Sequence, residues 1–283
     1  MKDLNQLALK LKTKIDAQPF IKWAGGKRQL LDELEKHKPK WFNRYFEPFV
    51  GGGALYFRIQ PGQSFLSDIN PELVNLYLII QSKVDELISE LKKLKVSEKE
   101  FYKIRNIDRK PEYREWNNIK KAARFIYLNK TCFNGLYRMN SKGHFNVPYG
   151  NQNNPKILDE YNLRQVNKLL QNSDIKCQSY SGIEKNVKKG DFVYFDPPYA
   201  PLNKSSFTKY FKDDFDIKMQ VDLRDLCDRL DKKGVYFMIS NSHTSLIFGL
   251  YKNYDIKVVD AIRAINCKGS GRGKVKEVLI TNY

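Results

Sequence analysis

The stretch DFVYFDPPYA, residues 191–200, joins an apolar run to an acid, two prolines and a tyrosine. An apolar run of this length, bounded by turn-forming residues, predicts a short strand buried on both faces, as in a parallel sheet. In open α/β sheets, ligands bind beyond the carboxyl ends of such strands, and Asp196 occupies that position. The stretch therefore predicts an α/β protein with a ligand site around Asp196.

The residues Asp196, Pro197 and Tyr199 suit the activation of an exocyclic amine on a purine. Such an amine is a weak nucleophile because its lone pair is delocalised into the ring. A carboxylate and a backbone carbonyl that accept its two hydrogens push the nitrogen toward tetrahedral geometry. Asp196 and the Pro197 carbonyl can accept them, and Tyr199 offers a flat stacking face. An ordinary acidic turn uses the same four letters, but the position at a strand end favours the ligand site.

A second strand–loop–helix unit is predicted in RYFEPFVGGGALYF, residues 44–57. Its glycines, among them Gly51 and Gly53, allow a ligand to approach the backbone closely. Further along, SFLSDIN predicts another strand that ends at Asp68, and an acid at this point suits ribose hydroxyls. The glycines do not follow the G-x-G-x-x-G spacing of a pyrophosphate loop, so we expect a nucleoside without phosphates rather than NAD.

The chain changes character between its two strand-rich parts. Residues 96–160 begin helical and basic and become turn-rich and aromatic, with a predicted β-hairpin around 141–143. We interpret them as an insert into a sheet domain made of residues 1–95 and 161–283. Two further strands near the C-terminus predict a terminal hairpin. The Lys-rich lead, residues 1–17, is either a short amphipathic helix or a loose tail.

Composition narrows the choice of partners. The net charge is +18, as expected for a protein that neutralises phosphates, although a general lysine bias would also produce it. The four cysteines and three histidines have no metal-ligand or disulfide spacing, so we expect neither a metal nor a disulfide. No apolar run is long enough for a membrane span and no signal peptide is recognisable, which favours a soluble cytoplasmic protein.

Seven motifs, in order, resemble the Dam and DpnII-type adenine-N6 DNA methyltransferases of the α arrangement. They are FIKWAGGK (20–27), FEPFVGGGALYF (46–57), LSDIN (66–70), FNGLYR (133–138), FNVPYG (145–150), DPPY (196–199) and RGKVKEVLITNY (272–283). The resemblance runs from about residue 18 to the C-terminus. It implies a Rossmann-like methyltransferase sheet with an inserted, mainly helical target-recognition domain that carries a hairpin. It also implies S-adenosylmethionine as cofactor and GATC in double-stranded DNA as the typical target.

The resemblance assigns roles to particular residues. The catalytic positions are Asp196, Pro197 and Tyr199, with Tyr199 stacking on a flipped-out adenine. The cofactor positions are Trp23, Lys27, Phe49, Gly51, Gly53, Asp68 and Asp196. The DNA-binding positions are Lys22, Phe133, Asn134, Leu136, Arg138, Pro148 and Arg272. Among these, Lys22 is expected to read the first guanine and Arg138 the guanine on the other side.

Several alternatives stay open at this stage. An RNA or protein-glutamine methyltransferase shares the acid or amide–Pro–Pro–Tyr loop, although those families usually carry Asn where this chain has Asp196. A DNA-binding regulator that has lost catalysis is a further alternative, against which the intact Asp68 and Asp196 argue. The enzyme can serve a restriction–modification system or act alone, and either a monomer or a weak dimer is expected. The motifs nevertheless predict methyl transfer to adenine in duplex DNA.

Overall fold

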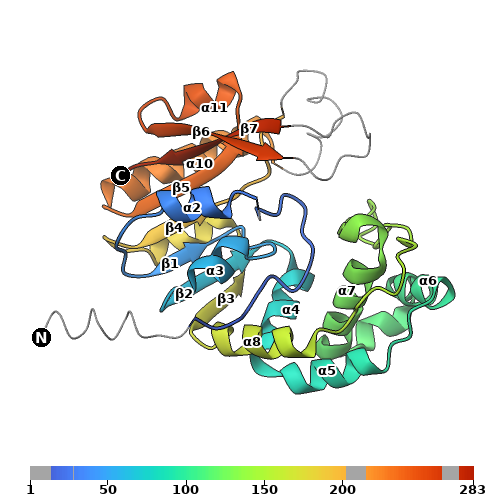
Figure 1. Ribbon diagram of the computed structural model, residues 1–283. Coiled ribbons are helices and arrows are strands. Elements are labelled where there is room, and N and C mark those ends of the chain that lie inside the picture. Colours follow the sequence, from blue (N-terminus) through green and yellow to red (C-terminus); the bar gives the residue numbers. More distant parts are fainter. Residues whose placement is uncertain (1–13, 28, 202–214, 263–273) are drawn as a thin grey trace, which may run out of the picture.

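The computed structural model describes residues 14–27, 29–201, 215–262 and 274–283. Within these ranges seven strands form one sheet in the order β3-β2-β1-β4-β5-β7-β6 (Figure 1). The strands are β1 (Tyr45–Glu47), β2 (Ser64–Asp68), β3 (Ser173–Cys177), β4 (Phe192–Phe195), β5 (Tyr236–Ser242), β6 (Asp255–Ile262) and β7 (Lys274–Thr281). The predicted α/β class is confirmed.

The first five strands are parallel, and β7 runs antiparallel between β5 and β6. The predicted terminal hairpin is therefore confirmed as β6–β7. The order in which strands are added to the sheet reverses between the parallel neighbours β1 and β4. From β1 the sheet extends to β2 on one side, and from β4 it extends to β5 on the other. A reversal of this kind opens a crevice at the carboxyl ends of the two central strands, where ligands bind in such sheets.

Helices cover both faces of the sheet (Figure 1). All the α-helices of the described residues are α2 (Leu31–His37), α3 (Ala54–Ile59), α4 (Pro71–Ser82), α5 (Val84–Lys92), α6 (Glu98–Asn106), α7 (Asn118–Thr131), α8 (Glu160–Leu170), α10 (Ile217–Lys232) and α11 (Ser245–Leu250). Side chains alternate along each strand, so Tyr45 enters the core under α3 and α4, whereas Phe46 enters the core under α10. Short 3₁₀ turns connect these elements: η1 (Ile107–Arg109), η2 (Pro111–Glu115), η3 (Phe133–Gly135) and η4 (Tyr180–Lys185).

A third, smaller core lies away from the sheet, on the right in Figure 1, where α6 and α7 meet the loop that follows them. Phe101, Tyr127 and Phe145 are fully buried in it. Its rim holds a buried ion pair, 2.7 Å between Arg124 Nη2 and Asp108 Oδ2, and the same carboxylate oxygen accepts a hydrogen bond from the Phe145 N–H. This core positions the segment from Phe133 to Tyr149.

The predicted hairpin around 141–143 is present as a turn, but its arms are not strands. Among the described residues of this region, single antiparallel bridges join Met139 to Phe145 and Cys132 to Tyr149. The side chain of Asn140 accepts the Lys142 and His144 N–H groups and so closes the turn locally. The expected β-hairpin is therefore present in short form, with backbone bonds from Asn140 N–H to the His144 carbonyl and from Asn146 N–H to the Arg138 carbonyl joining its arms.

Candidate active site

Asp196 follows β4 directly, at the carboxyl end of the central strand. Its Oδ1 lies 2.8 Å from the Nζ of Lys27, and the carboxylate is 21% exposed. Burial raises the pKa of Asp196 above its ordinary value, and the adjacent Lys27 ammonium opposes that rise. The carboxylate is thus an acceptor at the sheet edge, as predicted, and in this state its partner is a lysine.

Lys27 reaches the Asp196 carboxylate from the loop before α2. Its side chain is almost fully buried, donates to the Gly25 carbonyl at 2.6 Å, and holds its ammonium 4.7 Å above the ring of Tyr199. A cation in this position gains from the negative face of the ring. The ammonium therefore occupies the stacking face of Tyr199 and neutralises Asp196 at once.

The loop that carries Pro197, Pro198 and Tyr199 is fixed by neighbouring elements. The side chain of Gln220 in α10 donates to the Pro198 carbonyl at 3.0 Å. The hydroxyl of Tyr199 donates to Glu277 Oε2 in β7 at 2.7 Å, and burial raises the pKa of that hydroxyl well above its usual range.

Asn241 and Ser242 at the end of β5 hold the residue after the tyrosine. Asn241 Oδ1 accepts the Ala200 N–H at 3.2 Å, its amide donates to Gln220 at 3.1 Å, and the Ser242 hydroxyl donates to the Ala200 carbonyl at 2.6 Å. Our sequence reasoning missed Gln220, Asn241 and Glu277. A signal existed only for Asn241 and Ser242, which are polar residues at the end of an otherwise apolar strand.

The predicted cofactor residues of the glycine turn converge beside this edge. The Gly51 N–H donates to Asp68 Oδ2 at 3.1 Å, and the other Asp68 oxygen accepts the Asn70 N–H at 2.9 Å. Gly51 and Gly53 have positive φ angles of 46° and 64°. A Cβ on Gly51 would lie 2.6 Å from Cδ1 of Trp23, so only glycine admits the indole here.

Burial raises the pKa of Asp68, and the backbone N–H groups of Asn70 and Gly51 oppose the rise. Asn70 also caps α4, because its side-chain oxygen accepts hydrogen bonds from the N–H groups of Glu72 and Leu73 in the first turn of the helix. The carboxylate is thereby held at the mouth of the turn. Phe49 lies apart from this group. Its ring stacks on Tyr180 at 5.3 Å, in the core on the other face of the sheet.

Glu47, in the same FEPF motif, is a buried carboxyl group beneath the site. The Tyr45 hydroxyl donates to its Oε2 at 2.8 Å. Burial raises the pKa of Glu47 to about 8, and the nearby charge of Asp196 acts in the same direction. Glu47 is thus held as a neutral acid at neutral pH, and it adds no second negative charge beside Asp196.

Trp23 joins the glycine turn to the separate small core. Its ring stacks on Tyr137 at 5.6 Å and on Phe125 of α7 at 6.3 Å. The Tyr137 hydroxyl in turn donates to Glu72 of α4 at 2.9 Å. Tyr137 directly precedes Arg138, so an aromatic stack connects a predicted cofactor residue with a predicted DNA reader.

Most of the predicted DNA-binding residues lie in the segment from Phe133 to Pro148, and Lys22 is another of them. Phe133 is 46% exposed, and its N–H donates to the Pro148 carbonyl at 2.9 Å. Asn134 has a positive φ of 55°. Arg138 is exposed and donates to Asn146 at 2.7 Å. Of the other DNA positions, Lys22 and Pro148 are exposed, Leu136 is half-buried, and Arg272 lies outside the described residues.

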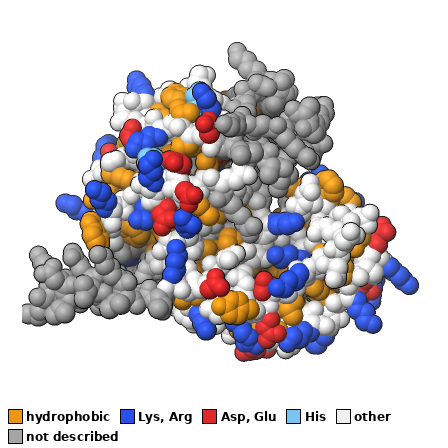
Figure 2. All heavy atoms as spheres, viewed as in Figure 1, with side chains coloured by type: hydrophobic (Ala, Val, Ile, Leu, Met, Phe, Trp, Pro, Cys, Tyr) orange, Lys and Arg blue, Asp and Glu red, His pale blue; other side chains and the backbone are white. Residues whose placement is uncertain are grey.

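The surface of the protein carries charges of both signs. Figure 2 shows lysine and arginine side chains over both parts of the visible face, with carboxylates between them. The described residues contain no group of three or more His, Cys, Asp or Glu placed to hold a metal ion. In the same part of the chain, no helix is long and apolar enough to cross a membrane.

Comparison with known proteins identifies the family to which the chain belongs. A family model described as D12 class N6 adenine-specific DNA methyltransferase matches residues 23–265. A type II methyltransferase of Methanocaldococcus jannaschii, M.MjaIII, is 46% identical over 290 residues, with 95% of this chain and 100% of the relative covered. A type II methyltransferase of Lactococcus lactis subsp. cremoris, M1.LlaDCHI, is 44% identical over 278 residues, with 96% and 98% covered.

The DNA adenine methylase of Escherichia coli strain K12 is 34% identical over 261 residues, with 92% of this chain and 93% of the relative covered. These matches extend over almost the whole length of both chains. Together with the parallel sheet and the acid at the end of β4, they establish the class of enzyme. The chain belongs to the D12 class of N6 adenine-specific DNA methyltransferases.

Proposed function

We propose that this enzyme transfers a methyl group from S-adenosylmethionine to N6 of an adenine that is flipped out of a GATC site in duplex DNA. The single observation that carries the proposal is that one ammonium, that of Lys27, contacts both the Asp196 carboxylate at the carboxyl end of β4 and the ring of Tyr199, which brings these two groups together. The family assignment gives the reaction class, and the motif resemblance gives the site and the flipped base.

The turn beside Asp196 fits a nucleoside-containing cofactor. Asp68 is fixed by two backbone N–H groups and keeps lone pairs for ribose hydroxyls. The indole of Trp23 packs directly on Gly51, so an aromatic ring lies beside this turn. Lys27, from the loop before α2, and Phe49, whose ring lies in the core on the other face of the sheet, complete the proposed cofactor set. S-adenosylmethionine supplies an electrophilic methyl group there.

The residues of the DPPY loop prepare the nucleophile. The Asp196 carboxylate and the Pro197 carbonyl accept the two hydrogens of the adenine amine and aim its lone pair outward. Tyr199 holds the base by stacking, and its hydroxyl bond to Glu277 fixes the ring. With S-adenosylmethionine bound, this arrangement would present the amine nitrogen to the methyl group that the sulfonium releases, and the nitrogen would afterwards give up a proton. No residue of the chain becomes covalently attached to the base.

Entry of the base requires that Lys27 give up its present position. Its ammonium now lies over the Tyr199 ring and against Asp196, which are the two groups that the adenine needs. A negatively charged group of the cofactor is the natural new partner for the ammonium. This exchange leaves the carboxylate free for the amine.

DNA recognition is proposed for the insert, residues 96–160, with 1–95 and 161–283 forming the catalytic domain. Lys22 and Arg138 read the two outer guanines, where a bidentate arginine contact is worth about 1–3 kcal/mol of discrimination. The other proposed DNA contacts are Phe133, Asn134, Leu136, Pro148 and Arg272. The net charge of +18 supports a polyanionic partner. We place the enzyme in the cytoplasm, with double-stranded DNA as its partner.

The first experiment measures transfer of a radiolabelled methyl group to duplexes that contain GATC, a scrambled site, or GATC with its adenines already N6-methylated. Transfer to unmodified GATC alone supports the proposal in full. Transfer to other adenines would keep the chemistry and replace the site. If no DNA accepts methyl, the same assay with RNA and with protein substrates tests the alternative acceptors.

A further inference from the structure

The segment that leads into the active site is fastened by three side-chain amides in the same way. At Ile15, Gln18 and Lys22, the backbone N–H donates to an amide oxygen while the carbonyl of the same residue accepts from the amide nitrogen. The three amides belong to Gln60, Asn162 and Asn129. Each pair copies the two-bond pattern by which one strand residue pairs with another, so each fixes both the position and the orientation of the peptide.

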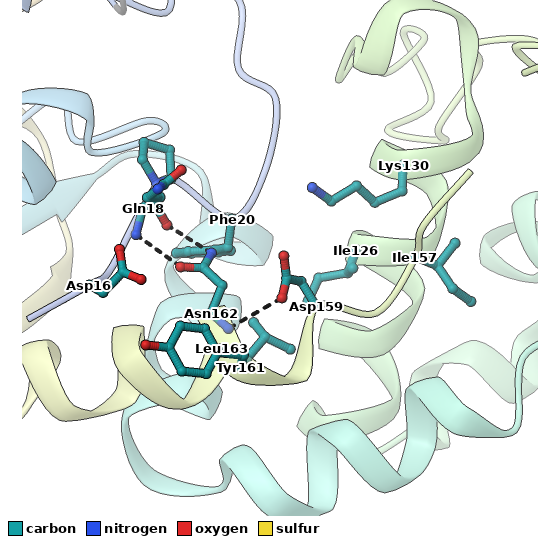
Figure 3. Close-up of a pocket in the computed structure, with 11 residues that line it drawn as sticks. Asp16, Gln18, Phe20, Ile126, Lys130, Ile157, Asp159, Tyr161, Asn162 and Leu163 are labelled. Carbon is teal, nitrogen blue, oxygen red and sulfur yellow. Dashed lines mark hydrogen bonds between the residues drawn. The ribbon is translucent and has the colours of Figure 1, made fainter. Parts of the chain in front are cut away.

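Two of these amide pairs serve the segment alone. Gln60 lies at the end of α3 and bonds Ile15 at 2.9 and 2.6 Å. Asn162 in α8 bonds Gln18 at 2.9 and 3.1 Å, and Figure 3 shows this pair at the edge of a cavity of about 300 Å³. In the figure, α7 lies across that cavity and carries Lys130. Neither amide touches the DNA-reading segment.

The third amide, Asn129, differs because it reaches a second target. It is almost fully buried near the end of α7, and its oxygen accepts the Lys22 N–H at 2.9 Å. Its nitrogen donates both to the Lys22 carbonyl at 2.7 Å and to the Gly135 carbonyl at 3.0 Å. One side chain therefore ties the backbone of Lys22 to the turn that presents Phe133 and Asn134.

The side chain of Lys22 depends on that turn for its direction. A Cβ on Gly135 would lie 2.6 Å from Cδ and 2.7 Å from Cβ of Lys22, so the lysine stem lies directly against the glycine. Gly135 has a positive φ of 67°, a conformation that glycine adopts without strain. The stem is thus held between the turn and its own fastened backbone, while the residue as a whole remains exposed.

We propose that Asn129 is a positioning residue for sequence choice: it aims Lys22 at its base pair by fixing the Lys22 peptide against the turn at 133–135. This inference rests on the proposed function, in which Lys22 reads a base. Arg138 does not share the dependence, because its side chain is held by Asn146 and its carbonyl by the Asn146 N–H. Loss of the Asn129 amide should therefore relax the choice at one base pair and leave the other outer pair discriminated.

The test uses the full chain and duplexes that carry every single-base replacement of the preferred site of the wild-type enzyme. Lys22→Ala first identifies the base pair that Lys22 reads. Asn129→Asp keeps the shape and the acceptor for the Lys22 N–H but turns both donated bonds into contacts between acceptors. We expect discrimination at the Lys22 base pair to fall by about tenfold in kcat/KM, with the other positions unchanged.

Asn162→Asp is the matched control, since it makes the same change in the same kind of pair without contact to the reading turn. Equal loosening in both variants, or a uniform loss of rate without any change in choice, would overturn the proposal. If Asn129→Asp does not fold, Gly135→Ala tests the same contact from the other side, and retention of wild-type choice in that variant would also overturn it. The relative rates of the wild-type enzyme on these duplexes test the GATC assignment by themselves. The comparison of variants tests the role of Asn129.

Discussion

The DPPY loop and the segment from Phe133 to Pro148 both present functional groups on irregular backbone, but they are supported differently. The loop carries its acid on the end of a central strand, and side chains from α10, β5 and β7 bond it from three sides. The segment is anchored through a few buried polar groups, chiefly Asn129 and Asp108, and its reading side chains point into solvent. In the proposed function, chemistry is therefore built into the sheet, and recognition rests on a small separate core.

This difference separates rate from choice. A group that must activate an amine needs a fixed geometry, which the sheet provides before the substrate arrives. A group that reads a base edge must reach into a groove and is therefore exposed. Changes in the loop should lower turnover at every site, whereas changes in the segment should alter which sites are used. The four variants below test that division.

Asp196→Ala should have the largest effect. Loss of the carboxylate removes one of two acceptors for the amine hydrogens, and we expect kcat to fall by about 10³-fold or more. DNA binding should remain, because the proposed DNA contacts come mainly from Lys22 and the segment from Phe133 to Pro148. Single-turnover methyl transfer and a gel-shift titration measure the two properties. Wild-type turnover in this variant would refute the mechanism.

Asp108→Ala tests the small core. It leaves the buried guanidinium of Arg124 without its carboxylate and the Phe145 N–H without its acceptor. Breaking a buried pair in this way costs about 3–5 kcal/mol, so thermal unfolding should move to lower temperature and specific DNA binding should weaken.

The control for this variant is Asp174→Ala, which breaks a half-exposed pair with Lys176 on β3. Exposed pairs contribute about 0–1 kcal/mol, so this control should be nearly neutral. If calorimetry shows equal losses for both variants, the small core has no special role in stability.

Arg138→Ala should relax sequence choice with little change in turnover at the preferred site. Loss of a bidentate guanine contact corresponds to about 1–3 kcal/mol of discrimination at one base pair. Competition between preferred and single-mismatch duplexes measures it. Lys142→Ala, an exposed change on the same turn, should preserve the wild-type ratio. An unchanged ratio in Arg138→Ala would show that the arginine does not read the base.

Glu47→Gln should have the smallest effect on methyl transfer and should act instead on the pH dependence of stability. The pKa of Glu47 is raised from 4.5 to about 8, so the unfolded chain releases the proton before the folded chain does. The stabilising contribution is full below about pH 4.5 and is lost as pH rises toward 8, by up to about 1.4 kcal/mol per pH unit. The glutamine variant should lack this slope in urea unfolding between pH 5 and 8, whereas the exposed change Glu86→Gln should keep it.

Much of the fold and the catalytic edge could be predicted from sequence, because local patterns determine them. Asp68 and Asp196 each end an apolar run, and Gly51 needs a conformation that other residues resist. These signals lie within a few residues of the chain. The terminal hairpin was predictable for the same reason.

The supports of the site could not be predicted in this way. Asn129 and Gln220 are ordinary polar letters in helices, and their buried bonds arise only when α7 and α10 pack against distant segments. The hairpin around 141–143 is shorter than expected, since only single bridges join its arms and the side chain of Asn140 closes the turn. Phe49 shares its motif with the glycines, but its ring enters the opposite core.

The stack of Trp23 on Tyr137 gives the enzyme an intrinsic optical reporter. Indole emission responds to the rings and charges around it, and this indole lies between the turn at Gly51 and the residue that precedes Arg138. Of the other two tryptophans, Trp41 is 75% exposed and Trp116 packs on Tyr113. Binding on either side of Trp23 should thus alter one emission band, so that cofactor loading and DNA engagement can be followed by the same spectroscopic signal without a label.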